Sequence, residues 1–264
     1  MVAEIQRRNL PAAAYTAQAN SAYRFDWGLD GLNCLAPGAQ VVVIVDVLRF
    51  TSAVSAAVEV GATVLPYRWN DDQAPAYAAS RGAKLLGTGG DAGTSLSPTE
   101  MLRLPAGARV VLPSPNGSTL AFTARECGAR HVLAGCLRNA AATARVARQL
   151  AGPHGGIAVI AAGERWYDTA GPVRPAVEDL IGAGAVLAAL DPAASVSAPA
   201  CSPEAAAARA AFVAARPRLY ETLINSASGQ ELVERGLDVD VVSAAAHDVT
   251  NWTAMLFDEG FIAT

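Results

Sequence analysis

Residues 40–47 read QVVVIVDV, and this run decides the fold. It is nearly all β-branched, with no polar residue between Gln40 and Asp46. Such a run is typical of a strand that is buried on both faces of a sheet. Four further short β-rich runs follow, and alanine-rich stretches with helical spacing separate them. The predicted strands are 40–47, 62–67, 109–113, 131–134 and 156–161, and the predicted helices between them are 52–59, 72–80, 118–127 and 139–150.

This alternation of strands and helices predicts an α/β fold in three layers, α/β/α, around a mostly parallel or mixed sheet. After Ala162 the pattern changes to helices alone. These are expected at 175–190, 203–215, 217–225 and 238–247, with a Pro/Ala/Ser linker at 191–201. We therefore expect one compact domain over residues 1–264, with a helix-rich C-terminal third. A subdomain boundary, if there is one, would fall near 191–202.

Composition excludes several classes of protein. The chain has 264 residues, 52 % of them apolar, and 20 Lys+Arg against 24 Asp+Glu leave a formal charge of −4. A chain this apolar is not intrinsically disordered, and it lacks the basic balance of a nucleic-acid-binding protein. No apolar run reaches the roughly 18 residues of a membrane span, and no signal peptide is evident.

The cysteines and histidines point to a reduced, cytoplasmic protein without zinc. The four cysteines are widely spaced and form no CxxC pair, as expected of reduced thiols. The three histidines show neither HxH nor HExxH spacing. The alanine-rich C-terminal helices would pack equally well within a monomer or across a homodimer, so both remain open.

Polar residues follow three of the predicted strands, which is where open α/β sheets bind ligands. The first segment is DVLRFTS at 46–52, where Asp46 closes an apolar strand and Arg49 follows. A buried carboxylate needs a cation or several hydrogen-bond donors. Asp46 either pairs with Arg49 or caps the next helix, or it is a metal ligand or nucleophile. In the second case Arg49 would bind an anion, since guanidinium groups match phosphate and carboxylate.

The second segment is PSPNGST at 113–119, between a strand and a helix. It offers hydroxyls, an amide and backbone N–H groups at a helix N-terminus, where phosphate binds well. The residues concerned are Ser114, Asn116, Gly117, Ser118 and Thr119. An Asn-Gly turn with a Ser/Thr cap has the same pattern and is an equal alternative. The chain contains no GxxxxGK[ST], which argues against a nucleoside-triphosphate P-loop.

The third segment, AAGERWYDTAGPVRPAVED at 161–179, gathers carboxylates and arginines. The carboxylates are Glu164, Asp168, Glu178 and Asp179, and the arginines are Arg165 and Arg174. Mg²⁺ is usually held by one or two carboxylates together with substrate phosphate oxygens. The competing interpretation is that the two last acids only favour a helix start and that the rest is a solvated loop.

A fourth, weaker segment is the glycine-rich run GTGGDAGTSLSP at 87–98. Its backbone N–H groups would suit an anion, and Asp91 is a further candidate acid. The glycines lack the GxGxxG order and no clear helix follows, so a nucleotide-binding oxidoreductase is disfavoured.

The motifs, taken together, resemble a known family. DVLRFTSAV (46–54), SLSPTE (95–100), LPSPNGST (112–119), AGCLRNAA (134–141), GERW (163–166), RPAVEDLIGAGA (174–185) and SASGQELVERGLDVDV (226–241) look like the successive motifs of the 2-phosphosulfolactate phosphatase (ComB-like) family. They run in the family's order over most of the chain. The chain departs from the family pattern in the glycine-rich loop and within residues 165–174.

The resemblance implies a layered α/β/α fold and a Mg²⁺-dependent phosphatase that acts on phosphate monoesters of small 2-hydroxy acids. It implies 2-phospho-3-sulfolactate as the substrate, released as 3-sulfolactate and phosphate in coenzyme M biosynthesis. A phosphatase for a non-sulfonated 2-hydroxy-acid phosphate is one alternative. A non-catalytic protein that binds a phosphorylated metabolite is the other.

We expect the following roles for the candidate residues. Mg²⁺ would bind a subset of Asp46, Glu164, Glu178 and Asp179, of which Asp46, Glu164 and Asp179 are also candidate catalytic residues together with Arg49. Arg49 and the turn 114–119 would hold the phosphoryl oxygens, and Arg165 or Arg174 would meet the carboxylate or sulfonate. Either a metal-activated water attacks phosphorus directly, or a carboxylate, Asp46 first, attacks through an acyl phosphate.

Overall fold

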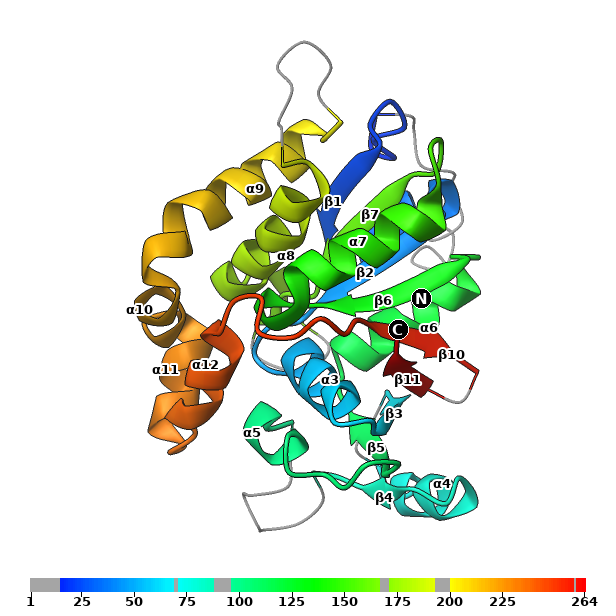
Figure 1. The fold of residues 1–264 in the computed structure, drawn as a ribbon, viewed down its shortest axis with the longest axis vertical. Coiled ribbons are helices and arrows are strands. Elements are labelled where there is room, and N and C mark those ends of the chain that lie inside the picture. The colour runs from blue at the N-terminus through cyan, green and yellow to red at the C-terminus, as the bar shows by residue number, and fades with distance from the viewer. Residues whose placement is uncertain (1–14, 69–70, 88–95, 167–170, 193–199, 259) are drawn as a thin grey trace.

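The computed structural model describes residues 15–68, 71–87, 96–166, 171–192, 200–258 and 260–264, and it is built around strand β2 (Val41–Val45) (Figure 1). This strand is fully buried and pairs in parallel with β7 (Ile157–Ala161) on one side and β6 (His131–Gly135) on the other. The nine-stranded sheet has the order β1-β7-β2-β6-β10-β11-β3-β5-β4. The α/β fold with a mixed sheet is therefore confirmed.

The sheet consists of two parallel sets joined by an antiparallel hairpin. The first set is β1 (Tyr23–Trp27), β7, β2 and β6, and the second is β3 (Thr63–Tyr67), β5 (Arg109–Pro113) and β4 (Lys84–Leu85). Between them β10 (Ala254–Phe257) and β11 (Gly260–Ala263) make three antiparallel pairings in series, so the second set runs opposite to the first.

Twist brings the two sets toward a common site. Neighbouring strands turn by roughly 20–25° each, so the five steps from β2 to β5 accumulate more than about 100°. β6 and β10 share two residue pairs, and β11 and β3 share one. The hairpin is therefore joined to each parallel set by few backbone pairings, which leaves the sheet free to twist there. The chain ends of β2 and β5 can thus approach one another although the strands are formally opposed.

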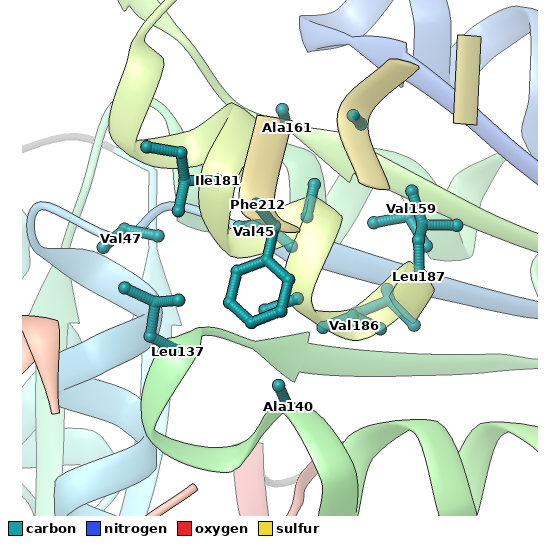
Figure 2. Close-up of a cluster of buried hydrophobic side chains, with 14 of the residues drawn as sticks. Val45, Val47, Leu137, Ala140, Val159, Ala161, Ile181, Val186, Leu187 and Phe212 are labelled. Atoms are coloured by element: carbon teal, nitrogen blue, oxygen red, sulfur yellow. The ribbon is translucent and has the colours of Figure 1, made fainter. Parts of the chain in front are cut away.

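Period-two alternation in β2 divides the core into two layers. Val41, Val43 and Val45 face a cluster that includes helical residues between Ala140 and Ala245, and Val42 and Ile44 face a second cluster with helical residues between Leu32 and Ala124. Figure 2 shows part of the first cluster, in which Val45, Val159 and Ala161 of the strands lie with Ile181, Val186, Leu187 and Phe212 from the C-terminal helices. The predicted arrangement of helices on both sheet faces is confirmed.

The helices follow the strands in the predicted order, and the C-terminal third is helical as expected. On the second-cluster face lie α2 (Gly28–Leu35), α3 (Phe50–Glu59), α5 (Pro98–Met101) and α6 (Gly117–Glu126), and α4 (Ala74–Ser80) covers the β4 edge. The remainder are α7 (Ala140–Ala151), α8 (Val177–Leu190), α9 (Pro203–Ala215), α10 (Leu219–Ile224), α11 (Ala227–Glu234) and α12 (Asp238–Ala245), and Figure 1 shows α8 to α12 gathered together beside the strands.

Close packing explains the glycines of α8. A Cβ on Gly182 would lie 2.4 Å from Val47 Cγ2, and one on Gly184 would lie 2.1 Å from the carbonyl oxygen of Ala208 in α9. These small residues let α8 approach a loop on one side and a helix backbone on the other. Among the described residues no helix is long and apolar enough to cross a membrane.

The elements that the sequence did not predict lie outside long apolar runs. β1 carries Arg24 and Asp26 and is an edge strand, so only one of its edges pairs with a long strand of the sheet. α11 has little apolar spacing and begins at Ser226, whose hydroxyl accepts the N–H of Gly229 at 3.0 Å. The hairpin β10–β11 was also missed, and the helix expected at 217–225 begins as a 3₁₀ turn before α10.

Candidate active site

The three sequence segments that follow β2, β5 and β7 line one pocket of about 260 Å³. Helix α11 closes the pocket from the other side. The lining residues are Asp46, Leu48, Arg49, Leu96, Ser114, Pro115, Asn116, Glu164, Ser228, Glu231, Leu232 and Arg235. Side chains that are more than a hundred residues apart in the chain thus face a common space.

Asp46 sits where two helices begin. Its Oδ1 accepts the N–H of Phe50, the first residue of α3, at 3.2 Å, and its Oδ2 accepts the N–H of Gly117, the first residue of α6, at 3.1 Å. The side chain is 7 % exposed. Burial raises the pKa of Asp46 to about 6, while the two N–H groups act in the opposite direction. The helix-cap interpretation therefore holds, and the same carboxylate also lines the pocket.

Arg49 takes Asp240 as an ion-pair partner. Its Nη1 donates to Asp240 Oδ2 of α12, and both side chains are buried. Ser97, the N-cap of α5, donates its hydroxyl to Asp240 Oδ1 at 2.5 Å. Arg49 is thus ion-paired with a more deeply buried carboxylate from the C-terminal third, although the charge of Arg49 also acts to lower the pKa of Asp46.

Some residues of the turn at 114–119 line the pocket, and others connect α6 to the sheet. Ser114 and Asn116 line the pocket. Gly117 gives its N–H to Asp46 and, at 3.1 Å, to Ser114 Oγ, so the first N–H group of α6 is taken up by a carboxylate and a hydroxyl. Ser118 Oγ bonds backbone groups of Tyr67 and Leu112, which fastens α6 to β3 and β5.

The remaining side chain of that turn, Thr119, has a buried hydroxyl oxygen with no hydrogen-bond partner in the structure. Neither Ser118 nor Thr119 is among the pocket-lining residues. A Cβ on Gly117 would lie 2.2 Å from Phe50 Cδ1 and 2.9 Å from Asp46 Oδ2. Only glycine allows this close approach of α6 to Asp46.

Glu164 enters the pocket from the short ribbon of β8 (Glu164–Arg165) and β9 (Val173–Arg174). Its Oε2 accepts the side-chain amide of Asn116 at 3.2 Å. Burial, with the charges of Asp46 and Glu178, raises the pKa of Glu164 to about 7. The pocket therefore holds two acidic groups whose ionised forms are disfavoured.

The β8–β9 ribbon places the two candidate arginines, Arg165 and Arg174, on different faces. Glu164 and Arg174 are direct partners in the antiparallel ladder, so their side chains lie on the same face, whereas Arg165 is paired with Val173. Arg174 lies over the ring of Trp166, with 5.8 Å from its Cζ to the ring centroid, and its Nη2 is 3.5 Å from the hydroxyl of Ser228. Arg165 instead donates to the carbonyl of Gly171 at 3.1 Å.

Asp179 and Glu178 stand behind the pocket at the start of α8, and neither is among the lining residues. Asp179 accepts the N–H of Val47 at 2.7 Å through Oδ1 and that of Gly163 at 2.9 Å through Oδ2. It thereby joins the chain ends of β2 and β7. Burial raises the pKa of Asp179 well above its usual value. Glu178 is 2 % exposed and lies close enough for its charge to raise the pKa values of Asp46, Glu164 and Asp179.

In the part of the chain that the structure describes, no three His, Cys, Asp or Glu side chains are arranged to hold a metal ion by themselves. The carboxylates nevertheless interact electrostatically, since the charge of Asp46 raises the pKa values of both Glu164 and Asp179. Asp168 and Asp91 lie outside the described residues, as does most of the glycine-rich loop.

Sequence reasoning missed the contribution of the C-terminal third. Ser228, Glu231 and Arg235 of the α11 segment line the pocket, and Asp240 of α12 holds Arg49. One signal was present: Asp240 interrupts the apolar spacing of VDVV at 239–242, as an acid does that faces inward to a buried partner. Helical periodicity alone did not indicate which cation it meets.

The comparisons with known proteins cover the part of the chain that forms this pocket. The model of the 2-phosphosulpholactate phosphatase family matches residues 35–258, which include every pocket-lining residue. The chain belongs to the 2-phosphosulfolactate phosphatase family. A relative from Thermus thermophilus, named "Probable 2-phosphosulfolactate phosphatase", is 34 % identical over 209 residues, covering 76 % of this chain and 81 % of that protein.

Membership of the 2-phosphosulfolactate phosphatase family confirms the resemblance that the motifs indicated, and it makes this chain a phosphoric monoester hydrolase. The expectation of an enzyme is thus confirmed, and the alternative of a non-catalytic binding protein is not supported. The segments DVLR (46–49), PSPNGST (113–119) and GERW (163–166) of this chain each contribute residues to the pocket.

Proposed function

We propose that this protein is a Mg²⁺-dependent phosphatase whose substrate is 2-phospho-3-sulfolactate, hydrolysed to 3-sulfolactate and phosphate. The observation that carries the proposal is the convergence of Asp46, Arg49, Ser114, Asn116 and Glu164 on one small pocket. Phosphoryl transfer needs mainly positioning and charge neutralisation, and an arginine, two carboxylates, a hydroxyl and an amide are suited to both.

Magnesium fits the chemistry of the donors. Asp46 and Glu164 both line the pocket, and burial together with repulsion from neighbouring carboxylates disfavours their ionised forms. A divalent cation would relieve that repulsion, and Mg²⁺ is commonly held by one or two carboxylates plus phosphate oxygens, which suits Asp46 and Glu164 in this pocket. When bound there, Mg²⁺ would polarise the phosphoryl group and offset its charge. Asp179, with both oxygens on backbone N–H groups, would support this site by fixing Val47 and Gly163.

Different side chains of the pocket are proposed to bind, orient and attack the phosphate ester. Arg49 is proposed to bind phosphoryl oxygens through its planar donor fork, which matches phosphate. Ser114 and Asn116 would orient the ester beside it. Asp46 is the candidate nucleophile, or else it orients the attacking water, and both routes remain open proposals.

Arg174 is the better of the two candidate arginines for the acidic tail of the substrate. It shares a face with Glu164 and approaches Ser228, which lines the pocket, whereas Arg165 points away toward Gly171.

The cytoplasmic setting is also a proposal. All four cysteines are described by the structure and are free thiols, and Cys136 and Cys201 are buried. This state suits a reducing compartment. A role in coenzyme M biosynthesis remains a prediction from the family.

Phosphate release from 2-phospho-3-sulfolactate and from phospholactate, each with Mg²⁺ and with a chelator, tests the proposal. We expect release from the sulfonated substrate with Mg²⁺ only, and at least about tenfold lower kcat/KM for phospholactate, since losing one charge-assisted contact costs roughly 1.5–3 kcal/mol. Equal turnover of both substrates would assign a non-sulfonated substrate instead, and turnover that persists in chelator would overturn the magnesium requirement.

A further inference from the structure

Arg49 is a buried arginine in the wall of the pocket, and its position depends on the far end of the chain. Its side chain is 5 % exposed and its Nη1 donates to Asp240, which follows 191 residues later. Asp240 lies in α12 and is fully buried. An arginine has a long, flexible side chain, so the direction of its guanidinium is set by the partner that it meets.

The Asp240 carboxylate has a second hydrogen-bond partner besides Arg49. Ser97 donates its hydroxyl to Asp240 Oδ1 at 2.5 Å, while Oδ2 receives Arg49. Ser97 Oγ also accepts the N–H of Glu100 at 3.3 Å as the cap of α5. Three elements, namely the start of α3, α5 and α12, therefore meet at one buried carboxylate.

Other acids in the same pocket compete for the guanidinium. Asp46 and Glu164 line the pocket beside Arg49. Without the charge of Asp240, these carboxylates would draw the Arg49 guanidinium toward them, since opposite charges in a poorly solvated pocket attract strongly. That movement would fill the space where cation and phosphoryl oxygens are to bind.

We infer that Asp240 is a positioning residue for the reaction: it holds the Arg49 guanidinium away from Asp46 and Glu164 and directs it to the phosphoryl oxygens, with Ser97 fixing the Asp240 carboxylate. The inference rests on the proposed function. It gives the C-terminal helices a part in phosphate binding beyond closing the pocket.

A purely structural role is the competing explanation, because removing one partner of a buried ion pair leaves an uncompensated charge. The chain offers a matched control in the pair of Arg138 and Glu59. Arg138 is also 5 % exposed and its Nη2 lies 2.8 Å from Glu59 Oε2, but neither residue lines the pocket. Glu59→Gln therefore removes the anionic partner of a buried arginine away from the site.

The experiment compares wild type, Asp240→Asn, Asp240→Glu, Ser97→Ala and Glu59→Gln. For each, kcat and KM for 2-phospho-3-sulfolactate are measured, together with the unfolding temperature and the binding of inorganic phosphate by calorimetry. We expect Asp240→Asn to lower kcat/KM and phosphate affinity by at least about tenfold, which is roughly 1.4 kcal/mol. Ser97→Ala should shift both in the same direction by less, and Asp240→Glu should recover part of the loss.

Glu59→Gln should lower the unfolding temperature yet keep both quantities within about twofold of wild type. In a double-mutant cycle, Asp240→Asn should add little to the loss that Arg49→Ala already causes. Additive losses in the cycle, or kinetics and phosphate affinity of Asp240→Asn and Ser97→Ala equal to those of wild type, would overturn the inference.

Phosphate binding separates this inference from the proposed function. If wild type binds phosphate but releases none from any substrate tested, the proposed function fails, and a weaker phosphate affinity of Asp240→Asn still supports the positioning role. If Asp240→Asn does not fold, Ser97→Ala decides: unchanged phosphate affinity in that variant contradicts the inference.

Discussion

Asp46 combines two tasks that usually fall to different side chains. It caps α3 and α6 through the N–H groups of Phe50 and Gly117, and it presents the same carboxylate to the pocket. Helix N-termini favour a negative charge, so the two caps keep this buried group ionisable against the penalty of burial. Burial nevertheless raises its pKa to about 6.

We expect Asp46→Asn to reduce phosphate release by at least about 100-fold with Mg²⁺ present, because the amide removes the charge and can accept from only one of the two N–H groups. Initial rates of release test this, with Asp238→Asn, an exposed acid at the start of α12, as the control. Turnover that stays within about tenfold of wild type would show that Asp46 is neither ligand nor nucleophile.

The raised pKa of Glu164 makes the folding stability of the protein depend on pH. Its pKa in the folded protein is raised to about 7, so the folded state holds this proton more tightly than the unfolded chain does. The stability that this group contributes is complete below its ordinary pKa and is lost as the pH rises through about 7. Glu164→Gln removes the charge and retains an oxygen to accept from Asn116.

We expect Glu164→Gln, in chelator, to raise the unfolding temperature by about 3 °C near pH 8 and to change it little near pH 5. Thermal scans at the two pH values measure the difference. Mg²⁺ should raise the unfolding temperature of wild type near pH 8 and do so less in the variant, as expected for a ligand that binds the folded state. An equal effect of the substitution at both pH values would contradict the assignment.

At the scale of elements, helix propensity alone does not explain the glycine at position 184 of α8, but close packing does. Gly184 lies in the middle of the helix, where alanine would stabilise an isolated helix by about 1 kcal/mol. In the folded protein a Cβ there would meet the Ala208 carbonyl oxygen at 2.1 Å. We therefore expect Gly184→Ala to destabilise the protein by about 1–3 kcal/mol. Denaturant unfolding gives the sign, and a gain in stability would show that α8 and α9 are less closely packed.

The elements that sequence predicts well are those whose own residues carry the signal. β2, β5 and β7 have apolar patterns that identify them locally, and the polar residues that follow these strands include Asp46, Asn116 and Glu164. The hairpin β10–β11 and helix α11 are stabilised mainly by contacts with distant elements. Their roles could not be deduced locally, and the partner of Arg49 depends on the same long-range packing.

At the scale of the whole molecule, the site joins the two oppositely directed parts of the sheet. Asp46 follows β2 in the first parallel set, and the turn at Asn116 follows β5 in the second, yet Gly117 N–H reaches Asp46. The C-terminal helices add the remaining wall and the anion behind Arg49. We expect these connections to make the chain unfold as one domain, in a single cooperative transition.

The location of the ligands tests the central claim most directly. A crystal structure with Mn²⁺ in place of Mg²⁺ and with inorganic phosphate would place both by anomalous scattering and difference density. The account predicts the cation at about 2.1 Å from a carboxylate oxygen of Asp46 or Glu164, with phosphate oxygens on Arg49. Cation and phosphate bound together at a different place, with this pocket filled by water alone, would contradict it.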